Sequence, residues 1–205
     1  MPFKNVTFPN LKLIHGLQKS VAEDTTFIKN ARQNLEDRVK KSKWPQYSWA
    51  YQGRAISRAD MEELLAFYND VEGTHYSFKF SDPDYPELNS ALLAHSTGTE
   101  WFLNIPYDTN TAGRHPIFHV NTGSLSVTVD GSPVVINSFS VNSDGLPVIS
   151  VLGTVGTEVV RVSGPFWHAA RFNMNLDWSL TALDQSNTPS YVTTNTIQLV
   201  ERFEY

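Results

Sequence analysis

Apolar and polar side chains alternate at every second position through most of this chain. Residues 125–130 alternate Leu or Val with Ser, Thr and Asp, and residues 47–52 and 76–81 alternate aromatic residues with smaller or polar ones. Because successive side chains of a β-strand point to opposite faces of its sheet, this period predicts half-buried strands. The same alternation runs through residues 166–183 and 197–203. We therefore expect a mainly β protein.

The composition supports this expectation. Ser, Thr and Asn number 19, 17 and 15, or 51 of 205 residues, and charged residues make up 18% of the chain. Small polar side chains compete with helical backbone hydrogen bonds but suit turns and the exposed faces of strands.

Charge and cysteine content exclude several classes of function. The chain has 16 basic and 21 acidic residues, a net charge of −5, which argues against nucleic-acid specificity and against an anionic membrane as partner. It has no cysteine, which excludes disulfides, thiolate catalysis and Cys-ligated zinc. No apolar run approaches the roughly 20 residues of a membrane span, and the first nine residues lack the build of a secretion signal. We expect a soluble product made in the cytoplasm.

One helix is predicted at about residues 58–71. Ser57 followed three residues later by Asp60 is typical of a helix N-cap, and Gly73 suits the position after a helix end. Apolar residues recur between them at helical spacing, at Met61, Leu64, Leu65, Tyr68 and Val71.

Residues 24–43 are ambiguous. Leu35 and Val39 have helical spacing, and Glu36 precedes Lys40 by four residues, which favours a helix. The preceding residues 25–28 read as a strand, and we favour strand and loop for the whole stretch.

The sequence predicts no catalytic residue, metal site or cofactor. On one strand His115 and His119 would lie about 13 Å apart, too far to share an ion. Residues 82–87 fail the pattern of a calcium loop and are interpreted as a proline-bounded turn whose acids bond their own backbone. No nucleophile elbow and no glycine-rich phosphate loop occurs.

Two groups of residues have alternative interpretations. A basic run is either a solvated face or a surface that pairs with acids in an assembly; it comprises Lys29, Arg32, Arg38, Lys40, Lys41 and Lys43. Aromatic residues such as Trp101, Trp167, Trp178 and Tyr191 either fill a core, which is the commoner fate, or stack against sugar rings.

Several motifs in order resemble one phage family. They are the aromatic strand 47–51, the helix 61–67 ending Leu-x-x-Phe, the strand 73–84 with Phe-x-Phe-x-Asp, the Arg-His-Pro-Ile of 114–117, the hairpin 124–131, the segment 166–172 and the closing Ile-Gln-Leu-Val-Glu of 197–201. Together they are similar to the distal tail proteins of long-tailed phages and gene-transfer agents.

The resemblance implies a structural virion protein without enzymatic activity. Such proteins form a hexameric ring at the tail tip of the virion, which joins the tail tube protein to the hub of the baseplate. It implies a tail-tube-like fold, a two-sheet β-sandwich or barrel flanked by one helix, with a small all-β domain inserted. We expect residues 1–108 and 167–205 to form the first domain and 109–166 the insertion.

The candidate ring contacts are charged. The basic residues Arg32, Arg38, Lys40, Lys41 and Lys43 are expected to meet acids of a neighbouring subunit such as Glu62, Glu63 and Glu72. Two other classes of function stay open. One is a carbohydrate- or receptor-binding β module of a phage tail, with Trp101 and Trp167 as contacts, and the other is a cell-wall hydrolase.

Overall fold

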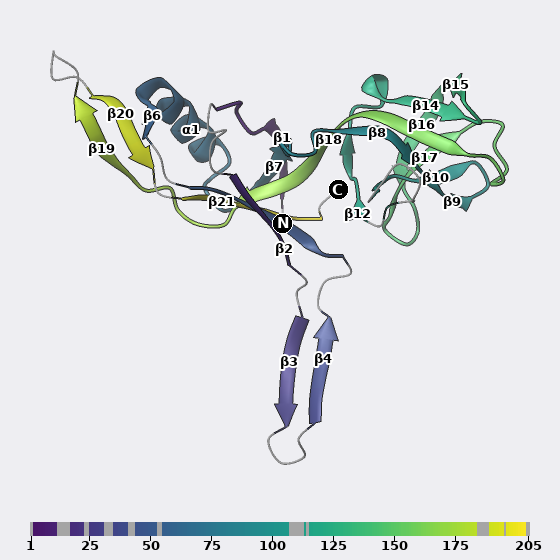
Figure 1. Cartoon of the computed structure of the whole chain (residues 1–205), viewed down its shortest axis with the longest axis horizontal. Coiled ribbons are helices and arrows are strands. Elements are labelled where there is room, and N and C mark those ends of the chain that lie inside the picture. The colour runs from purple at the N-terminus through teal and green to yellow at the C-terminus, as the bar shows by residue number, and fades with distance from the viewer. Residues whose placement is uncertain are drawn as a thin grey trace. The chain divides into compact units, whose positions relative to one another are not determined.

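The computed structural model describes most of the chain as β-strands (Figure 1). The described residues are 2–11, 17–22, 25–30, 35–40, 44–52, 55–106, 113, 115–183, 189–194 and 196–203. The chain divides into two compact units, of which unit 1 comprises Met1–Lys79 with Ala169–Glu204 and unit 2 comprises Phe80–His168. The prediction of a mainly β protein is confirmed.

The main sheet of unit 1 joins strands from both ends of the chain. Its order is β1 (Phe3–Thr7), β7 (Ser77–Phe80), β18 (Val160–Phe172), β21 (Ile197–Glu201), β5 (Gln46–Tyr51) and β2 (Leu17–Ala22). Strand β1 pairs with β7 in parallel, whereas β21 pairs antiparallel with β18 and β5, and β5 pairs antiparallel with β2. Among the described strands, β1 and β2 are therefore the two edges of this sheet.

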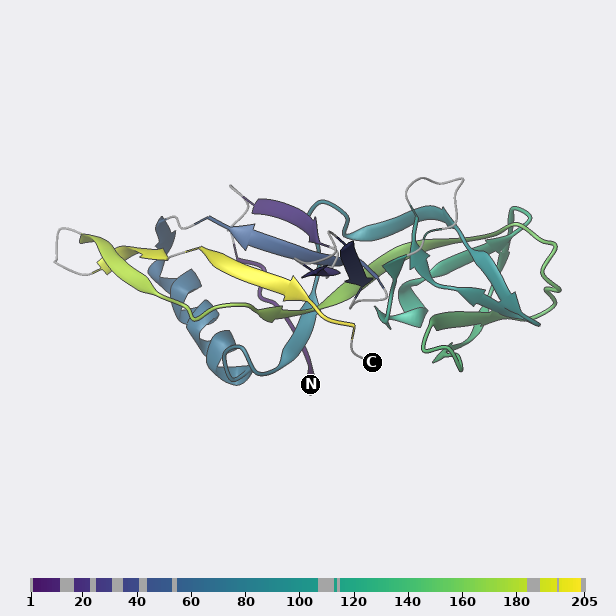
Figure 2. The same cartoon turned by 90° about the horizontal axis from the view of Figure 1, so that it is seen from below.

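Helix α1 (Arg58–Asp70) covers one face of this sheet (Figures 1 and 2). As predicted, the Ser57 hydroxyl accepts the Asp60 backbone N–H at 3.1 Å, and Met61, Leu64 and Val71 are buried. The helix ends at Asp70, one residue before the predicted position. In the turn that follows, Gly73 has a φ of 65° and donates its backbone N–H to the Tyr68 carbonyl.

Aromatic rings fill the space between α1 and the sheet. The ring of Phe67 lies 4.9 Å from that of Phe78, and Phe78 lies 5.3 Å from Phe172. Trp49 and Leu199, at paired positions of β5 and β21, are fully buried. The alternation at residues 47–51 thus predicted the buried face correctly.

Two smaller sheets complete unit 1. One joins β19 (Trp178–Leu183), β20 (Pro189–Thr194) and β6 (Ala55–Ser57), and the other is the hairpin of β3 (Thr25–Asn30) and β4 (Leu35–Lys40). The preference for strands in 24–43 is confirmed at residues 25–30 and 35–40. The alternation predicted across 166–183 is broken at 173–177, which connects β18 to β19 and leaves Met174 40% exposed.

The strands of unit 2 fall into two sheets, of which the first shares β18 with the main sheet. One contains β8 (Glu87–Leu92), β13 (His119–Val120) and β14 (Ser126–Val129), each paired with β18, and β15 (Ser132–Val134), paired with β14. The other has the order β16 (Ile136–Val141), β17 (Pro147–Val151), β10 (Glu100–Phe102) and β9 (Ala94–Thr97). Strands β11 (Asn104–Ile105) and β12 (His115–Pro116) form a short pair, and η1 (Thr122–Ser124) is a 3-10 turn.

The hairpin of β14 and β15 follows its sequence signal. Val129 pairs with Ser132, and the two turn residues Asp130 and Gly131 both have positive φ, of 50° and 84°. A two-residue hairpin turn of type I′ requires a positive φ at both of its central residues.

The observed division of the chain differs from the predicted one at its first boundary. Residues 80–108 were assigned to the first domain, but they belong to unit 2. Leu88, Leu93 and Trp101 from this segment pack in one hydrophobic cluster with Ile149 and Val160. The boundary between the units depends on which later strands bury Leu88, Leu93 and Trp101. The alternating pattern of residues 80–108 does not indicate which strands those are.

Within the described ranges, no helix has the length and apolar character needed to cross a lipid bilayer.

Candidate functional site

Two of the five basic residues predicted as ring contacts, Arg38 and Lys40, lie on the β3–β4 hairpin. Lys29 belongs to β3, and Arg38 and Lys40 belong to β4, while Arg32, Lys41 and Lys43 lie outside the described residues. Among the described strands, β3 and β4 pair only with each other. An isolated two-stranded hairpin is marginally stable in water, which makes this element a natural site for a partner.

The predicted acidic partners belong to α1 and its C-terminal turn. Glu62 forms an ion pair with Arg58 of the same helix at 2.8 Å, and both side chains are more than half exposed. Glu63 and Glu72 are exposed, and Glu72 has a φ of 53°. The described contacts therefore assign Glu62 a partner within its own helix.

Trp101, predicted as a sugar contact, is a core residue. It is 2% exposed, and its indole N–H donates to the Thr154 hydroxyl at 3.0 Å. A buried ring cannot stack against a sugar, so this prediction is wrong. Trp167 is half-buried in β18, where it pairs with His119.

The two histidines considered for a metal do not share a strand. His115 lies in β12 and pairs with Ile105, whereas His119 lies in β13 and pairs with Trp167. The premise of one continuous strand is wrong, because residues 117 and 118 separate two short strands. The ring of His115 lies instead beside that of His168, with centroids 5.9 Å apart.

The acidic segment after β7 is the turn that was predicted. The Asp84 backbone N–H donates to Asp82 Oδ1 at 3.0 Å, and the Tyr85 N–H donates to the Asp82 carbonyl at 3.1 Å. Asp82 itself is buried. Nearby, partial burial raises the pKa of the Tyr85 hydroxyl, and the Tyr85 ring packs on Phe166.

A groove on the main sheet of unit 1 was not predicted from the sequence. It has a volume of about 510 Å³. Its lining comes from four neighbouring segments and comprises Gln18, Lys19, Ser20, Ser48, Trp49, Ala50, Asn173, Gln198 and Leu199. No local motif could have revealed it, because the groove depends on the order β18, β21, β5, β2.

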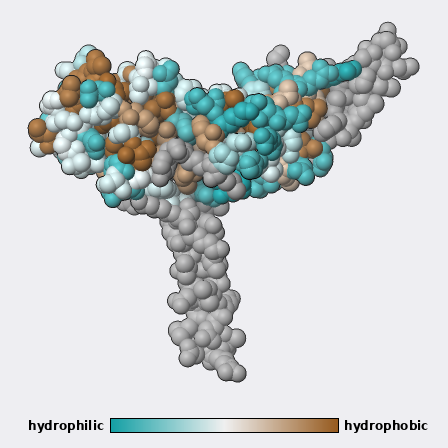
Figure 3. Space-filling model, turned by 180° about the vertical axis from the view of Figure 1, so that it is seen from behind, coloured by the Kyte–Doolittle hydropathy of each residue, from teal (hydrophilic) through white to brown (hydrophobic). Residues whose placement is uncertain are grey.

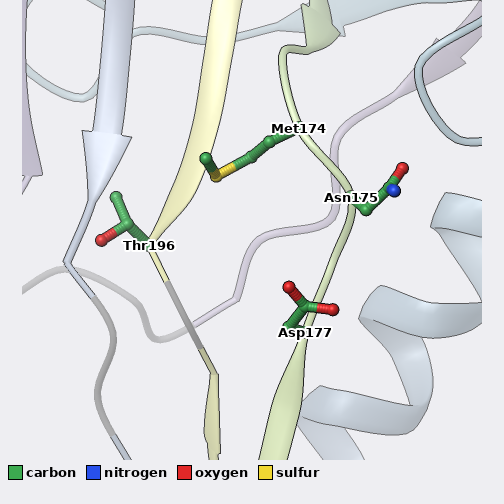
Figure 4. A pocket seen from close by; sticks show the side chains of 4 residues that line it. All are labelled: Met174, Asn175, Asp177 and Thr196. Carbon is green, nitrogen blue, oxygen red and sulfur yellow. The ribbon is translucent and has the colours of Figure 1, made fainter.

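A second depression lies at the end of β18 in unit 1 (Figure 4). Met174, Asn175, Asp177 and Thr196 line it. The Met174 side chain extends toward the strand that Thr196 precedes, whereas Asn175 points away and accepts the Tyr68 hydroxyl at 3.2 Å. One carboxylate, one amide and one hydroxyl surround an apolar thioether and provide hydrogen bonding. Among the described residues of this lining there is no histidine or second acid for acid–base work.

No protein-family model matches the chain, and no curated protein is significantly similar to it. The candidate contact residues and the two hollows must therefore be interpreted from their own geometry.

Proposed function

We propose that this protein is a structural subunit of a virion, a distal tail protein of a phage with a long non-contractile tail. In this proposal copies of the chain form a hexameric ring that joins the tail tube protein to the hub of the tail tip. The motif order described above supports the proposal, as does the combination of a β-rich unit carrying a single helix with a second β unit inserted in the chain.

The observation that carries the proposal is the open main sheet of unit 1. Its edges are β1 and β2, and β2 exposes 58% of Val21. The unpaired backbone N–H and C=O groups of an edge strand can bond to the sheet of a neighbouring copy. An edge contact between two different strands is heterologous, and such contacts close into a ring when the rotation between copies permits.

The basic hairpin supplies a second contact in this proposal. Charged residues fix the register of an interface more than they strengthen it, and the basic run is expected to meet Glu63 and Glu72 on the next copy. Because Glu62 already forms an ion pair with Arg58, it contributes less to this contact between copies than Glu63 and Glu72 do.

The test is assembly of the purified chain. Light scattering and electron microscopy should show six-membered rings, alone or with the tail tube protein added. Val21→Lys places a charge on the edge strand and should abolish the rings. Val159→Lys, at a 47% exposed valine of unit 2, is the matched control and should leave them intact. A chain that stays monomeric with every tail partner contradicts the proposal.

A receptor-binding module remains the second candidate because Trp167 keeps part of its surface in unit 2. Binding of the wild-type chain to a glycan array, lost in Trp167→Ala, would favour it. Absence of glycan binding argues against this candidate.

A further inference from the structure

The groove on the main sheet of unit 1 is lined by neutral polar side chains. Trp49 and Leu199 are fully buried, and Lys19 pairs with Trp49, so these three side chains belong to the face that α1 covers. The other six lining residues alternate with them and share the opposite face. They are Gln18, Ser20, Ser48, Ala50, Asn173 and Gln198. The groove therefore offers three carboxamides, two hydroxyls and one methyl group.

The hollow follows from the sizes of these side chains. Ala50 on β5 pairs with Gln198 on one side and with Gln18 on the other, and Asn173 follows beyond Gln198. In the next row two serines pair across β5 and β2. The short side chains thus form the floor of the groove, and the longer amides stand around it. Neighbouring strands are about 4.8 Å apart, so the row from Asn173 to Gln18 is about 14 Å long.

Four of the polar side chains are held in place by hydrogen bonds to each other. Asn173 Nδ2 donates to Gln198 Oε1 at 3.4 Å, and the Asn173 backbone N–H donates to the Gln198 carbonyl at 2.9 Å. The hydroxyls of Ser20 and Ser48 are hydrogen-bonded at 2.6 Å. A carboxamide has two N–H donors and a carbonyl with two lone pairs, and a hydroxyl has one donor and two lone pairs. These bonds therefore use only part of the hydrogen-bonding capacity of the four side chains.

The chemistry of the lining restricts the ligand. The described lining contains no carboxylate that could bind a cation. Its one charged group, the ammonium of Lys19, lies 4.5 Å from the centre of the Tyr47 ring and belongs to the other face, so an anion finds no cation among the six side chains. An apolar ligand would bury amides and hydroxyls without hydrogen bonds, which is unfavourable. On the side of the molecule that Figure 3 shows, the described surface of unit 1 also has smaller hydrophobic areas than that of unit 2.

We infer that this groove binds a neutral oligosaccharide. Each sugar hydroxyl both donates and accepts hydrogen bonds, as the amides and hydroxyls of the lining do. The groove volume of about 510 Å³ lies within the roughly 300–1,000 Å³ that is typical of ligand sites. The six described side chains of this face include no aromatic ring, so the affinity comes from hydrogen bonds. The site uses no residue of unit 2 and does not require copies of the chain to assemble.

Saturation-transfer nuclear magnetic resonance of the full chain tests this inference. The neutral probes are maltohexaose, cellohexaose and chitohexaose at millimolar concentration, and the anionic probe is hexagalacturonate. We expect transfer from the protein to at least one neutral probe and none to the anionic probe. The method observes the sugar, so it works equally well with a single chain and with a large assembly.

Variants of the groove locate the bound sugar. Ala50→Leu fills the floor and keeps every amide and hydroxyl of the lining, and we expect it to abolish the transfer. Gln18→Ala changes an exposed side chain of the edge strand β2, and it should weaken binding about five-fold, the effect of one lost hydrogen bond. Asn137→Ala removes an exposed amide from β16 in unit 2 and is the matched control, which should bind as the wild type does. Circular dichroism checks that each variant is folded.

Several results overturn the inference. They are the absence of transfer to all three neutral probes, transfer to the anionic probe alone, and transfer that is unchanged in Ala50→Leu and Gln18→Ala. If transfer persists in these variants but is lost in Trp167→Ala, the sugar binds unit 2, as the second candidate function predicts.

Assembly of the same variants separates this site from the proposed ring. Loss of sugar binding in Ala50→Leu with rings formed as in the wild type supports the groove site and leaves the proposed tail ring intact. Loss of rings in Ala50→Leu, when the wild type binds no sugar, means that this face contacts another copy and overturns the sugar site. Sugar binding by a chain that never forms rings supports the groove site and contradicts the ring.

Discussion

The indole N–H of Trp101 donates to the hydroxyl of Thr154 at 3.0 Å, and this bond ties strand β10 to the loop that precedes β18 inside unit 2. Both residues are at most 3% exposed. The pair links the hydrophobic core of unit 2 to the conformation of the loop that presents Leu152 and Val155.

Trp101→Phe should destabilise the chain by about 2 kcal/mol, because it removes a buried hydrogen bond and part of a core side chain. Urea denaturation followed by fluorescence or circular dichroism measures the change. Trp167→Phe, at a half-buried position of the same unit, is the control and should cost less than half as much. Equal losses would mean that the bond to Thr154 contributes little.

Glu158 should make the loop between β17 and β18 sensitive to acid. Its backbone hydrogen bonds, first its own and then those of Val155, Gly156 and Thr157, hold the pKa of the carboxyl below its ordinary value. A carboxyl with a lowered pKa in the folded state stabilises the loop above the ordinary glutamate pKa, and this contribution is lost as the pH falls through the lowered pKa.

Hydrogen exchange at the three amides checks this prediction. Protection at residues 155–157 should be present at neutral pH and diminish as the pH falls below the ordinary pKa of a glutamate, after correction for the intrinsic exchange rate. Glu158→Gln should show the lowered protection already at pH 6. Protection that does not change with pH or with the substitution would contradict the role of the carboxylate.

Gly156 and Gly98 form a matched pair for a steric test. Both have positive φ, of 95° and 56°, but a Cβ at Gly156 would lie 2.6 Å from His95, whereas one at Gly98 would meet nothing within 4 Å. The His95 ring packs beside Trp101, with ring centroids 5.1 Å apart, and lies 3.0 Å from the Gly98 carbonyl, so a shift of the ring would disturb both contacts.

Gly98→Ala should therefore lower the free energy of unfolding by about 1 kcal/mol, because alanine is strained in a left-handed conformation. Gly156→Ala should lower it by about 2 kcal/mol or more, because the added methyl group also clashes with His95. Thermal and urea denaturation of the two variants give the difference. Similar costs for both would show that His95 yields to the added methyl group.

Reversal of the basic run should weaken assembly. Lys40, Lys41 and Lys43 changed together to Glu would place like charges opposite the acids that they are expected to meet, and we expect association about ten-fold weaker or worse. Sedimentation at low and high salt measures the effect, which should shrink as salt screens the charges. Unchanged ring formation would exclude the charge pairing.

Local patterns predicted much of the secondary structure. Alternation predicted the strands at 47–51 and 77–80, and the Ser57 cap with the apolar spacing after it predicted α1 to within one residue. These features depend on neighbours within one turn or one strand, so the sequence contains their physical cause. The same method failed at residues 173–177, where an alternating pattern continues but the chain forms a connection between β18 and β19 and not a strand.

The sequence alone determined the mainly β fold class, the single described α-helix, the turns at 82–87 and 130–131, and the lack of cysteine chemistry. Periodicity, capping and composition are local properties, so the sequence contains them directly. Only the tertiary structure decided that Trp101 is buried and that residues 80–108 belong to unit 2. It also decided that Gln198 and residues of the adjoining strands line a groove, and that Leu152 and Val155 are exposed. An alternating strand presents two faces, and which face is covered depends on strands distant in the sequence that pack against it.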